Sequence, residues 1–251
     1  MLLLGVLTVC NCTDAQVKKR IKRGRRNKSE SQFMLDKNYF QAEWEVGHET
    51  MSSDLSTNVY PNLVVRYGVS KKLEVNAELN VVTAKVQSTK TNTSGIEPIS
   101  LGINYLLFSE TVKSPAIIFS GQFAVPFMAT KNFTANYLAP TLEMIVEKAL
   151  GKKVVLAFSN GLFWDGFSTS PSYIYNAAAS YNLSTKWEFT SEWFGFINGS
   201  PPQHNTDFSI SYSINKSLQF GVTSGIGISS AAHKNYIAVN GVWGCHLKRN
   251  K

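Results

Sequence analysis

Residues 73–81 alternate apolar and polar side chains without interruption. Successive side chains of a β-strand point to opposite faces, so this segment has one apolar wall and one polar wall. The alternation indicates a strand whose two faces meet different surroundings. The apolar wall consists of Leu73, Val75, Ala77, Leu79 and Val81, and the polar wall of Glu74, Asn76, Glu78 and Asn80.

The same two-residue period returns along the chain from residue 39 onward. Residues 141–150 are ambiguous, because they also place apolar residues at helical spacing, with Gly151 in the position of a helix C-cap. We predict a strand there, since residues 141–147 alternate and the neighbouring elements are strands. Residues 154–164 are also predicted as a strand, although either face of it could be the apolar one. The period is clear in residues 40–46, 62–69, 99–107, 187–192, 207–214 and 218–226, and looser in 115–127, 173–183 and 236–243.

Counting these segments gives about twelve strands, each close to the ~9–11 residues that cross a bilayer at a tilt. Short and long connections alternate between them. Transmembrane barrels have this asymmetry, with short periplasmic turns and longer external loops. The sequence therefore predicts an all-β fold, a closed antiparallel up-and-down transmembrane β-barrel with both ends of the barrel in the periplasm. The longer connections are expected at 48–57, 86–97, 128–137, 165–171, 197–206 and 229–234.

A soluble β-sandwich would alternate in the same way, with its apolar face buried between two sheets. The even strand count and the paired short and long links favour the barrel. In a barrel the polar face lines a lumen, where water and polar side chains hydrate the charges, and Arg66 is the expected charge partner of the glutamates. The candidates for this lumen face are Glu43, Glu45, Arg66, Glu74, Asn76, Glu78, Glu143, Glu188, Glu192 and Asp207.

Aromatic residues make up 12% of the chain, and several fall near the ends of the predicted strands. Tyrosine and tryptophan gather at membrane–water interfaces because their rings are amphipathic. The candidates for such girdles are Trp44, Tyr60, Trp164, Tyr173, Trp187 and Trp243.

The N-terminal region divides into two parts. Residues 1–16 have a short apolar core and small residues at the cleavage positions, which predicts a secretory signal peptide. Residues 17–38 form a basic segment predicted to be flexible, followed by the barrel at 39–245 and a polar tail at 246–251. Residues 18–28 carry eight Lys and Arg side chains, so the net charge of +8 leaves about zero for the rest of the chain. This segment is either solvated or in contact with anionic lipid or another acidic surface.

Composition excludes several classes of protein. Hydrophobic residues reach 43% and charged residues only 17%, unlike a disordered chain. No internal apolar run is long enough for a membrane-spanning helix. A basic tail without a recognition helix or stacking motif gives no reason to expect nucleic acid as a partner. Cys10 and Cys12 fall in the predicted signal peptide, which leaves Cys245 without an intramolecular disulfide partner.

No catalytic constellation or metal site is predicted, and no cofactor is expected. His48, His204 and His233 fall in predicted loops and His246 in the tail, and none has metal-ligand spacing with another ligand. No nucleotide-binding glycine pattern follows a strand and opens a helix. A membrane-embedded lipid hydrolase stays as a remote alternative, because serines are abundant and no particular one is paired with a histidine.

Several segments carry a resemblance to a known family. Residues 39–43 (YFQAE), 61–69 (PNLVVRYGV) with 73–75 (LEV), 99–105 (ISLGINY), 115–117 (PAI) and 138–140 (LAP) resemble the outer-membrane proteins named for the meta-pathway of phenol degradation, especially those of Bacteroidetes. The resemblance covers about residues 30–244. It implies an outer-membrane β-barrel of Gram-negative bacteria with a role in the uptake of hydrophobic compounds. The sequence departs from such barrels after Trp243, where eight further residues replace a terminal aromatic.

The predicted function is a passive channel or porin-like transporter for small compounds, including hydrophobic ones. Its expected partners are membrane lipid and a small-molecule solute, and the sequence gives no oligomeric state. The alternatives are a non-transport envelope barrel that acts through its external loops, and the lipid hydrolase.

Overall fold

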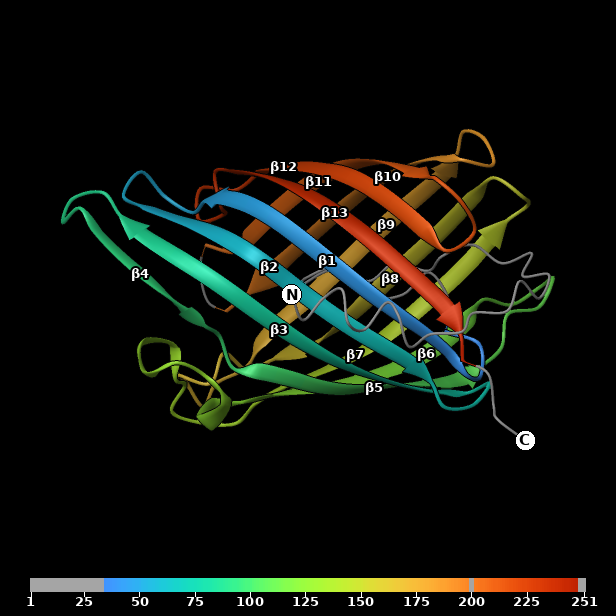
Figure 1. The fold of residues 1–251 in the computed structure, drawn as a ribbon, viewed down its shortest axis with the longest axis horizontal. Helices are drawn as coiled ribbons and strands as arrows, with labels where there is room; N and C mark the ends of the chain where they lie inside the picture. The colour runs from blue at the N-terminus through green and yellow to red at the C-terminus, as the bar shows by residue number, and fades with distance from the viewer. Residues whose placement is uncertain (1–33, 199–200, 248–251) are drawn as a thin grey trace.

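The computed structural model describes residues 34–198 and 201–247. Strands make up almost all of it, and twelve of them close into a barrel (Figure 1). The strands are β1 (Tyr39–Thr50), β2 (Leu55–Gly68), β3 (Leu73–Val86), β4 (Thr91–Ile96), β5 (Ile99–Phe108), β6 (Ala116–Val125), β7 (Ala139–Leu150), β8 (Val154–Phe163), β9 (Ser172–Asn182), β10 (Trp187–Ile197), β11 (Gln203–Ser213), β12 (Leu218–Gly227) and β13 (Asn235–His246).

Neighbours in the chain are neighbours in the barrel, and every pairing is antiparallel. The first and last strands close the sheet over their full length, from Tyr39 opposite His246 to Thr50 opposite Asn235. The prediction of a twelve-stranded up-and-down barrel is therefore confirmed.

Strand β4 is an addition that the sequence pattern did not predict. It pairs only with the far half of β3, from Val81 to Val86, while the near half of β3 pairs with β5. The hairpin of β3 and β4 thus extends beyond the barrel wall (Figure 1). The sequence pattern predicted only a longer connection over residues 86–97 and missed this strand, because residues 91–95 are all small or polar and show no apolar alternation to mark it.

The ambiguous residues 141–150 lie within strand β7, so the helical alternative is excluded. Leu142 and Met144 are exposed on one face, whereas Ile145 and Glu147 are buried. The segment 154–164 also forms a strand, β8, which pairs with β7 from Val154 to Phe163.

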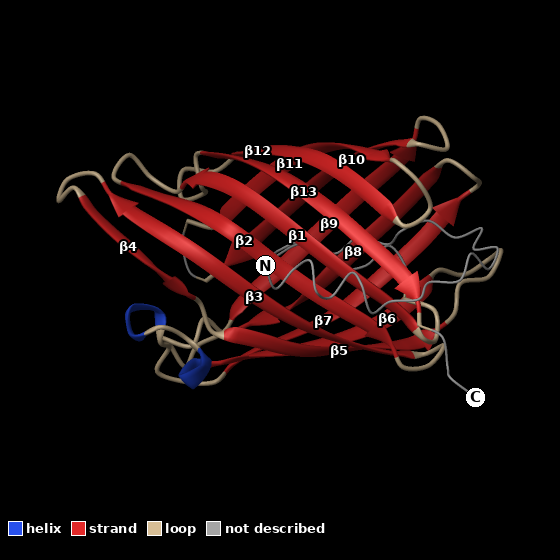
Figure 2. Ribbon diagram, viewed as in Figure 1, coloured by secondary structure: helices blue, strands red, loops and turns tan. Residues whose placement is uncertain are grey.

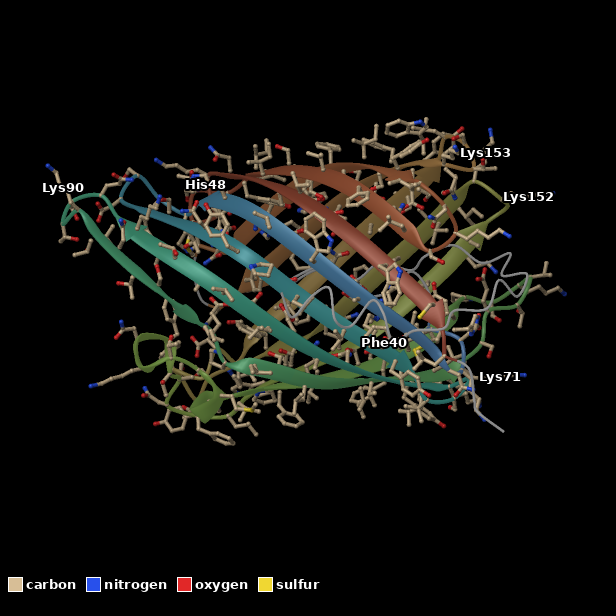
Figure 3. All side chains as sticks on the ribbon, viewed as in Figure 1. Phe40, His48, Lys71, Lys90, Lys152 and Lys153 are labelled. Carbon is tan, nitrogen blue, oxygen red and sulfur yellow. The ribbon has the colours of Figure 1, made fainter. Side chains whose placement is uncertain are left out.

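Connections of two kinds gather at opposite ends of the barrel. The turn end has the connections 69–72, 109–115, 151–153, 183–186 and 214–217, and Lys71, Lys152 and Lys153 lie there (Figure 3). The loop end has the connections 51–54, 126–138, 164–171, 198–202 and 228–234 and the β4 hairpin. Two short 3-10 helices, η1 (Pro126–Met128) and η2 (Lys131–Phe133), lie at this end (Figure 2). The predicted alternation of lengths holds only in part: 126–138, 164–171 and 228–234 are long, whereas 51–54 and 198–202 are shorter than predicted because the strands run further, and 109–115 at the turn end is longer than either.

The two faces of the barrel wall differ sharply in polarity. On β11, Asp207, Ser209 and Ser211 are buried on the inward face, whereas Phe208 and Ile210 keep 51% and 45% of their surface exposed. The same arrangement recurs around the wall, with large apolar side chains outside and polar ones inside. It is the reverse of a soluble protein, in which apolar side chains are buried. An apolar exterior on a closed sheet is the surface that a bilayer covers, so the fold is a transmembrane β-barrel. Among the described residues, no helix is long and apolar enough to cross a membrane.

We predict that Ile210→Arg destabilises the barrel by about 2–4 kcal/mol, because it places a charge on the lipid face in the middle of a strand. Val112→Arg is the matched control, since Val112 is 96% exposed in a turn, and it should change stability little. Urea unfolding in lipid vesicles, followed by tryptophan fluorescence, measures both. Equal effects of the two substitutions would contradict a lipid-facing Ile210.

Candidate functional site: the acidic lumen

A buried ionic cluster spans β1, β2 and β3 near the turn end of the lumen. Arg66, which is 2% exposed, donates from Nε to Glu74 Oε1 over 2.7 Å, and its second guanidinium nitrogen lies 2.7 Å from the same oxygen. Its third nitrogen lies 3.4 Å from Glu43 Oε1, which also accepts a 2.8 Å hydrogen bond from Gln41. The strand register aligns these residues, because Arg66 stands opposite Gln41 on β1.

Glu74 is the centre of this cluster and is fully buried. Besides the contacts from Arg66, its carboxylate accepts a 3.1 Å hydrogen bond from Asn104 on β5 and a 2.9 Å hydrogen bond from the backbone N–H of Leu35. Donors from β2, β5 and the lead-in backbone therefore converge on this one carboxylate.

Other carboxylates are distributed around the inward face, each with polar neighbours on adjacent strands. Glu78 accepts hydrogen bonds from Asn62 at 2.6 Å and from Asn80 at 3.1 Å. The remaining pairs join Glu143 to Ser159 at 3.2 Å, Glu192 to Asn176 at 3.2 Å, and Asp207 to the hydroxyl of Tyr236.

Negative charge dominates this surface. Among the described residues, the buried ionisable side chains are five carboxylates and a single guanidinium, that of Arg66. Glu45, Glu78, Glu143 and Glu188 lie half-buried on the same faces of their strands. The buried carboxylates are Glu43, Glu74, Glu147, Glu192 and Asp207.

Some inward residues were not among the sequence candidates. Glu147 is fully buried on β7, and Gln41, Asn104 and Asn176 join the hydrogen-bond networks. The two-residue period marks all of them as polar-face residues, so the same signal could have found them.

The lead-in segment, residues 34–38, packs inside the barrel at its turn end. Met34 is buried in a cluster with Ile118 of β6 and Ile145 of β7, and Leu106 of β5 packs against it. These three strand residues share the inward face, so the lumen contains an apolar patch that the alternation alone does not reveal. The segment 17–38 was predicted to be flexible; its described part is packed, and residues 17–33 lie outside the described residues, as does the predicted signal peptide.

A glycine makes this packing sterically feasible. A Cβ on Gly68 would lie 2.0 Å from the carbonyl oxygen of Asp36, so only glycine allows the lead-in segment to approach β2 so closely. The backbone N–H of Asn38 also donates to the carbonyl of Gly68 over 2.7 Å. The lead-in segment is therefore fixed to the wall at both Gly68 and Glu74.

The aromatic candidates lie at different depths along the strands. Trp187 begins β10 and Trp243 lies near the end of β13, both at the turn end, while Tyr173 lies at the loop end of β9. Trp164 directly follows β8, where its indole N–H donates to the carbonyl of Thr169 over 3.1 Å. Trp44 and Tyr60 lie inside their strands rather than at the ends, so the expectation of terminal positions was wrong for these two.

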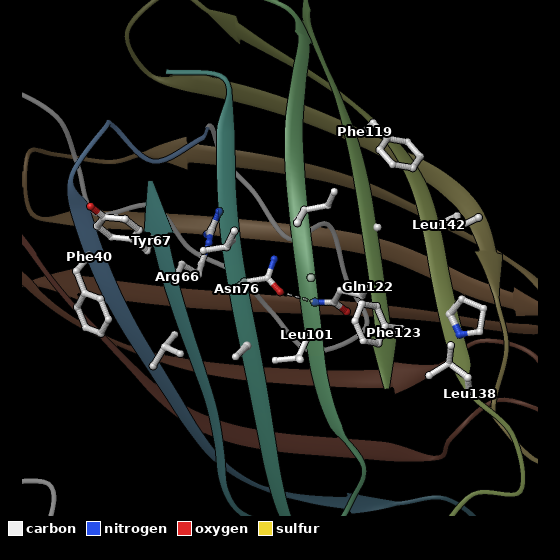
Figure 4. Close-up of a pocket in the computed structure, with 17 residues that line it drawn as sticks. Phe40, Arg66, Tyr67, Asn76, Leu101, Phe119, Gln122, Phe123, Leu138 and Leu142 are labelled. Carbon is white, nitrogen blue, oxygen red and sulfur yellow. Dashed lines mark hydrogen bonds between the residues drawn. The ribbon is translucent and has the colours of Figure 1, made fainter. Parts of the chain in front are cut away.

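The outer wall has a concave apolar groove of about 750 Å³ over β1, β2, β3, β5, β6 and β7 (Figure 4). Leu101, Ile103, Phe123 and Leu142 line it and are all partly exposed, which places the groove on the exterior. Gly121 has no side chain to fill the groove. A Cβ added there would enter open space, with no atom closer than 3.5 Å. On the inner side of the wall, Gln122 donates a 3.1 Å hydrogen bond to Asn76, shown dashed in Figure 4.

The described histidines are dispersed. His48 bonds to Asn58 at 2.7 Å, His204 to the hydroxyl of Tyr175 at 2.5 Å, and His233 to Glu49. Over residues 34–198 and 201–247, no three His, Cys, Asp or Glu side chains come together as a metal site.

Comparison with known proteins places the chain in a family. Residues 23–244 match the family described as "Putative MetA-pathway of phenol degradation". The chain belongs to this family. No curated protein matches it in sequence. Similar solved structures are 8–12% identical in sequence to this member of the phenol-degradation family. At that identity their likeness supports the fold alone.

Three such structures cover most of the chain. The COG4313 outer membrane channel from Pseudomonas putida F1 is 12% identical, with 84% of this chain and 97% of that chain covered and a TM-score of 0.66. The KdgM porin in complex with disordered oligogalacturonate is 8% identical, with coverages of 81% and 98% and a TM-score of 0.58. The NanC porin is 10% identical, with coverages of 83% and 100% and a TM-score of 0.54.

Removing Arg66 should destabilise this family member severely. Arg66→Ala leaves Glu43 and Glu74 buried without their cation, and breaking one side of a buried ion pair costs about 3–5 kcal/mol. The matched control is Glu110→Gln, which neutralises a partly exposed ion pair with Lys148 at 3.5 Å and should cost less than about 1 kcal/mol. The temperature at which the folded, fast-migrating form is lost on a gel reports both, and equal temperatures for the two variants would show that the Arg66 pair is not a structural requirement.

Proposed function

We propose that the chain is a passive channel of the bacterial outer membrane that admits small neutral or cationic compounds. The observation that carries this proposal is the closed barrel with an apolar exterior and a polar, acidic interior. Such an interior hydrates small solutes and repels anions. The short turns would face the periplasm and the longer loops the outside.

The family description suggests a solute class. Phenol is small, uncharged below its pKa near ten, and able to exchange hydrogen bonds with amides and carboxylates such as those of Asn76, Gln122 and Glu78. A narrow twelve-stranded lumen filled largely by side chains favours solutes of this size over larger ones. Small aromatic or weakly polar compounds are the class that we propose.

The lead-in segment bears directly on conduction. Met34 and Leu35 are buried in the lumen, at 6% and 2% exposure, and they narrow its turn end. This favours a second candidate, a non-transport envelope barrel that acts through its loops. The proposal includes no enzymatic step, and the rings of His48, His204 and His233 pair with Asn58, Tyr175 and Glu49.

Planar-bilayer recording in a KCl gradient tests the channel. The unaltered chain should give small, cation-selective currents, and Met34→Gly/Leu35→Gly should give larger ones, because it removes the side chains that fill the turn end while keeping the Leu35 N–H. The reversal potential should favour K⁺ over Cl⁻ in both proteins. Glu110→Gln, in the 109–115 connection at the turn end, is the control and should change neither current nor selectivity.

Two outcomes would count against the proposal. Silent bilayers for both proteins, each with confirmed heat-modifiable migration, would favour the non-transport barrel. Anion-selective currents would contradict the acidic lumen as the conduction path.

A further inference from the structure

We infer that the lumen, at its loop end, holds a binding site for a single-ring aromatic compound that carries an O–H or N–H donor. The site consists of an apolar patch on the inner face of β8, β9 and β10, made of Phe163, Ile174 and Phe196 and called the mouth patch below, and of the Glu143 carboxylate beside it. The inference rests on the proposed function for its class of solute, but its test measures binding and needs no transport.

The strand register brings these residues together on one face. Glu143 of β7 stands opposite Gly161 of β8, and Gly161 stands opposite Ile174 of β9. Ile174 in turn stands opposite Phe196 of β10. Phe163 follows Gly161 by two residues, so it shares the same face and lies one step nearer to the 164–171 connection.

A contact between two rings confirms that this face is the inner one. Phe163 and Phe196 lie on strands separated by β9, and strands two apart are ~9–10 Å from each other. Their ring centroids are nevertheless 6.3 Å apart at an interplanar angle of 70°, so the rings converge over β9 on the concave side of the wall. Both rings and Ile174 are only half-buried, whereas Ser159 and Asn176, deeper on the same face, are buried at 0% and 2% exposure. A solute at the loop end of the lumen therefore meets apolar side chains before polar ones.

A glycine places a carboxylate at the edge of the mouth patch. A Cβ on Gly161 would lie 2.0 Å from the carbonyl oxygen of Leu142 and 2.9 Å from Cγ of Glu143, so only glycine allows Glu143 to lie so close to β8. The Glu143 side chain is half-buried, and its Oε1 accepts a 3.2 Å hydrogen bond from Ser159. Ser159 is its one hydrogen-bond partner within the described chain. The carboxylate thus keeps capacity to accept a hydrogen bond from a solute.

The chemistry of these groups selects the ligand. Two phenylalanine rings at a steep angle form a corner in which a third ring meets one face and one edge, and both are favourable aromatic contacts. Sites for small molecules combine such an apolar surface with a few polar groups that fix orientation. A carboxylate accepts strongly from an O–H or N–H group. The mouth patch with Glu143 therefore favours a ring with a donor over a plain hydrocarbon ring, and it repels aromatic anions.

Titration of the full chain in non-ionic detergent with para-fluorophenol, followed by fluorine NMR, tests the site. Empty micelles of the same detergent give the baseline for partition. We expect a saturable shift for the unaltered chain, and Phe163→Ala/Phe196→Ala should raise the Kd roughly tenfold, because the contacts of two rings are lost. The matched control is Phe189→Ala/Phe208→Ala, which removes a lipid-facing ring pair with centroids 6.1 Å apart and should leave the Kd unchanged.

A second variant tests the polar end of the site. Glu143→Leu should raise the Kd for para-fluorophenol roughly fivefold or more, because a hydrogen bond to a charged acceptor is lost. Fluorobenzene has no donor, so its Kd should be the same for this variant and the unaltered chain. Heat-modifiable migration reports whether each variant folds. If Phe163→Ala/Phe196→Ala does not fold, Phe196→Leu keeps the apolar character, removes one ring and should still raise the Kd about twofold or more.

The outcomes separate the binding site from the channel. An unchanged Kd in the folded ring variants, or an equal rise in the Phe189→Ala/Phe208→Ala control, would overturn the mouth patch as the site. Equal effects of Glu143→Leu on the two probes would overturn the carboxylate as the group that recognises the donor. Saturable binding that depends on Phe163 and Phe196, together with silent bilayers, would support the site and count against the channel. Cation-selective currents without saturable binding would overturn the site and leave the channel supported.

Discussion

Closure of the sheet is the constraint on which the rest of this structure depends. In a bilayer every backbone N–H and C=O must find a partner within the protein, and a β-sheet achieves this only without free edges. The twelve aligned residue pairs between β1 and β13 provide that closure. Strand β4 lies at the loop end and pairs with β3 alone. Its other edge lies outside the barrel wall, so it does not interrupt closure of the sheet.

Closure in turn determines where the charges lie. Once one face of every strand meets lipid, ionisable side chains gather on the other face, in a space too narrow to hydrate them as bulk water would. The structure stabilises them with paired networks, of which Arg66 with Glu43 and Glu74 is the most deeply buried. The lead-in segment belongs to the same network, because the Leu35 N–H donates to Glu74. The carboxylates that make the lumen polar also hold the chain that narrows it.

Much of the barrel wall could be predicted from the sequence, because a strand repeats every two residues and the two faces have opposite polarity. The alternation assigns Asp207 inward and Phe208 outward correctly, and it marks Glu74 and Glu78 as inward. Strand β4 could not be predicted, since its residues do not alternate. Packing of Met34 against Ile118 and Ile145 could not be predicted either, because contacts across a lumen join residues distant in sequence and leave no local period. The external groove depends on the curvature of six strands together, which no single segment encodes.

The most direct test of the central claim, that one face of each strand meets lipid and the other an aqueous acidic interior, is the accessibility of spin labels placed one at a time along β11. With Cys10, Cys12 and Cys245 replaced by serine, labels at positions 206 to 212 are compared for collision with oxygen, which partitions into lipid, and with a polar nickel reagent. The structure predicts a two-residue alternation, with oxygen accessibility highest at positions 208, 210 and 212 and lowest at 207, 209 and 211. Uniform accessibility along the strand, or an alternation of the opposite phase, would contradict the account.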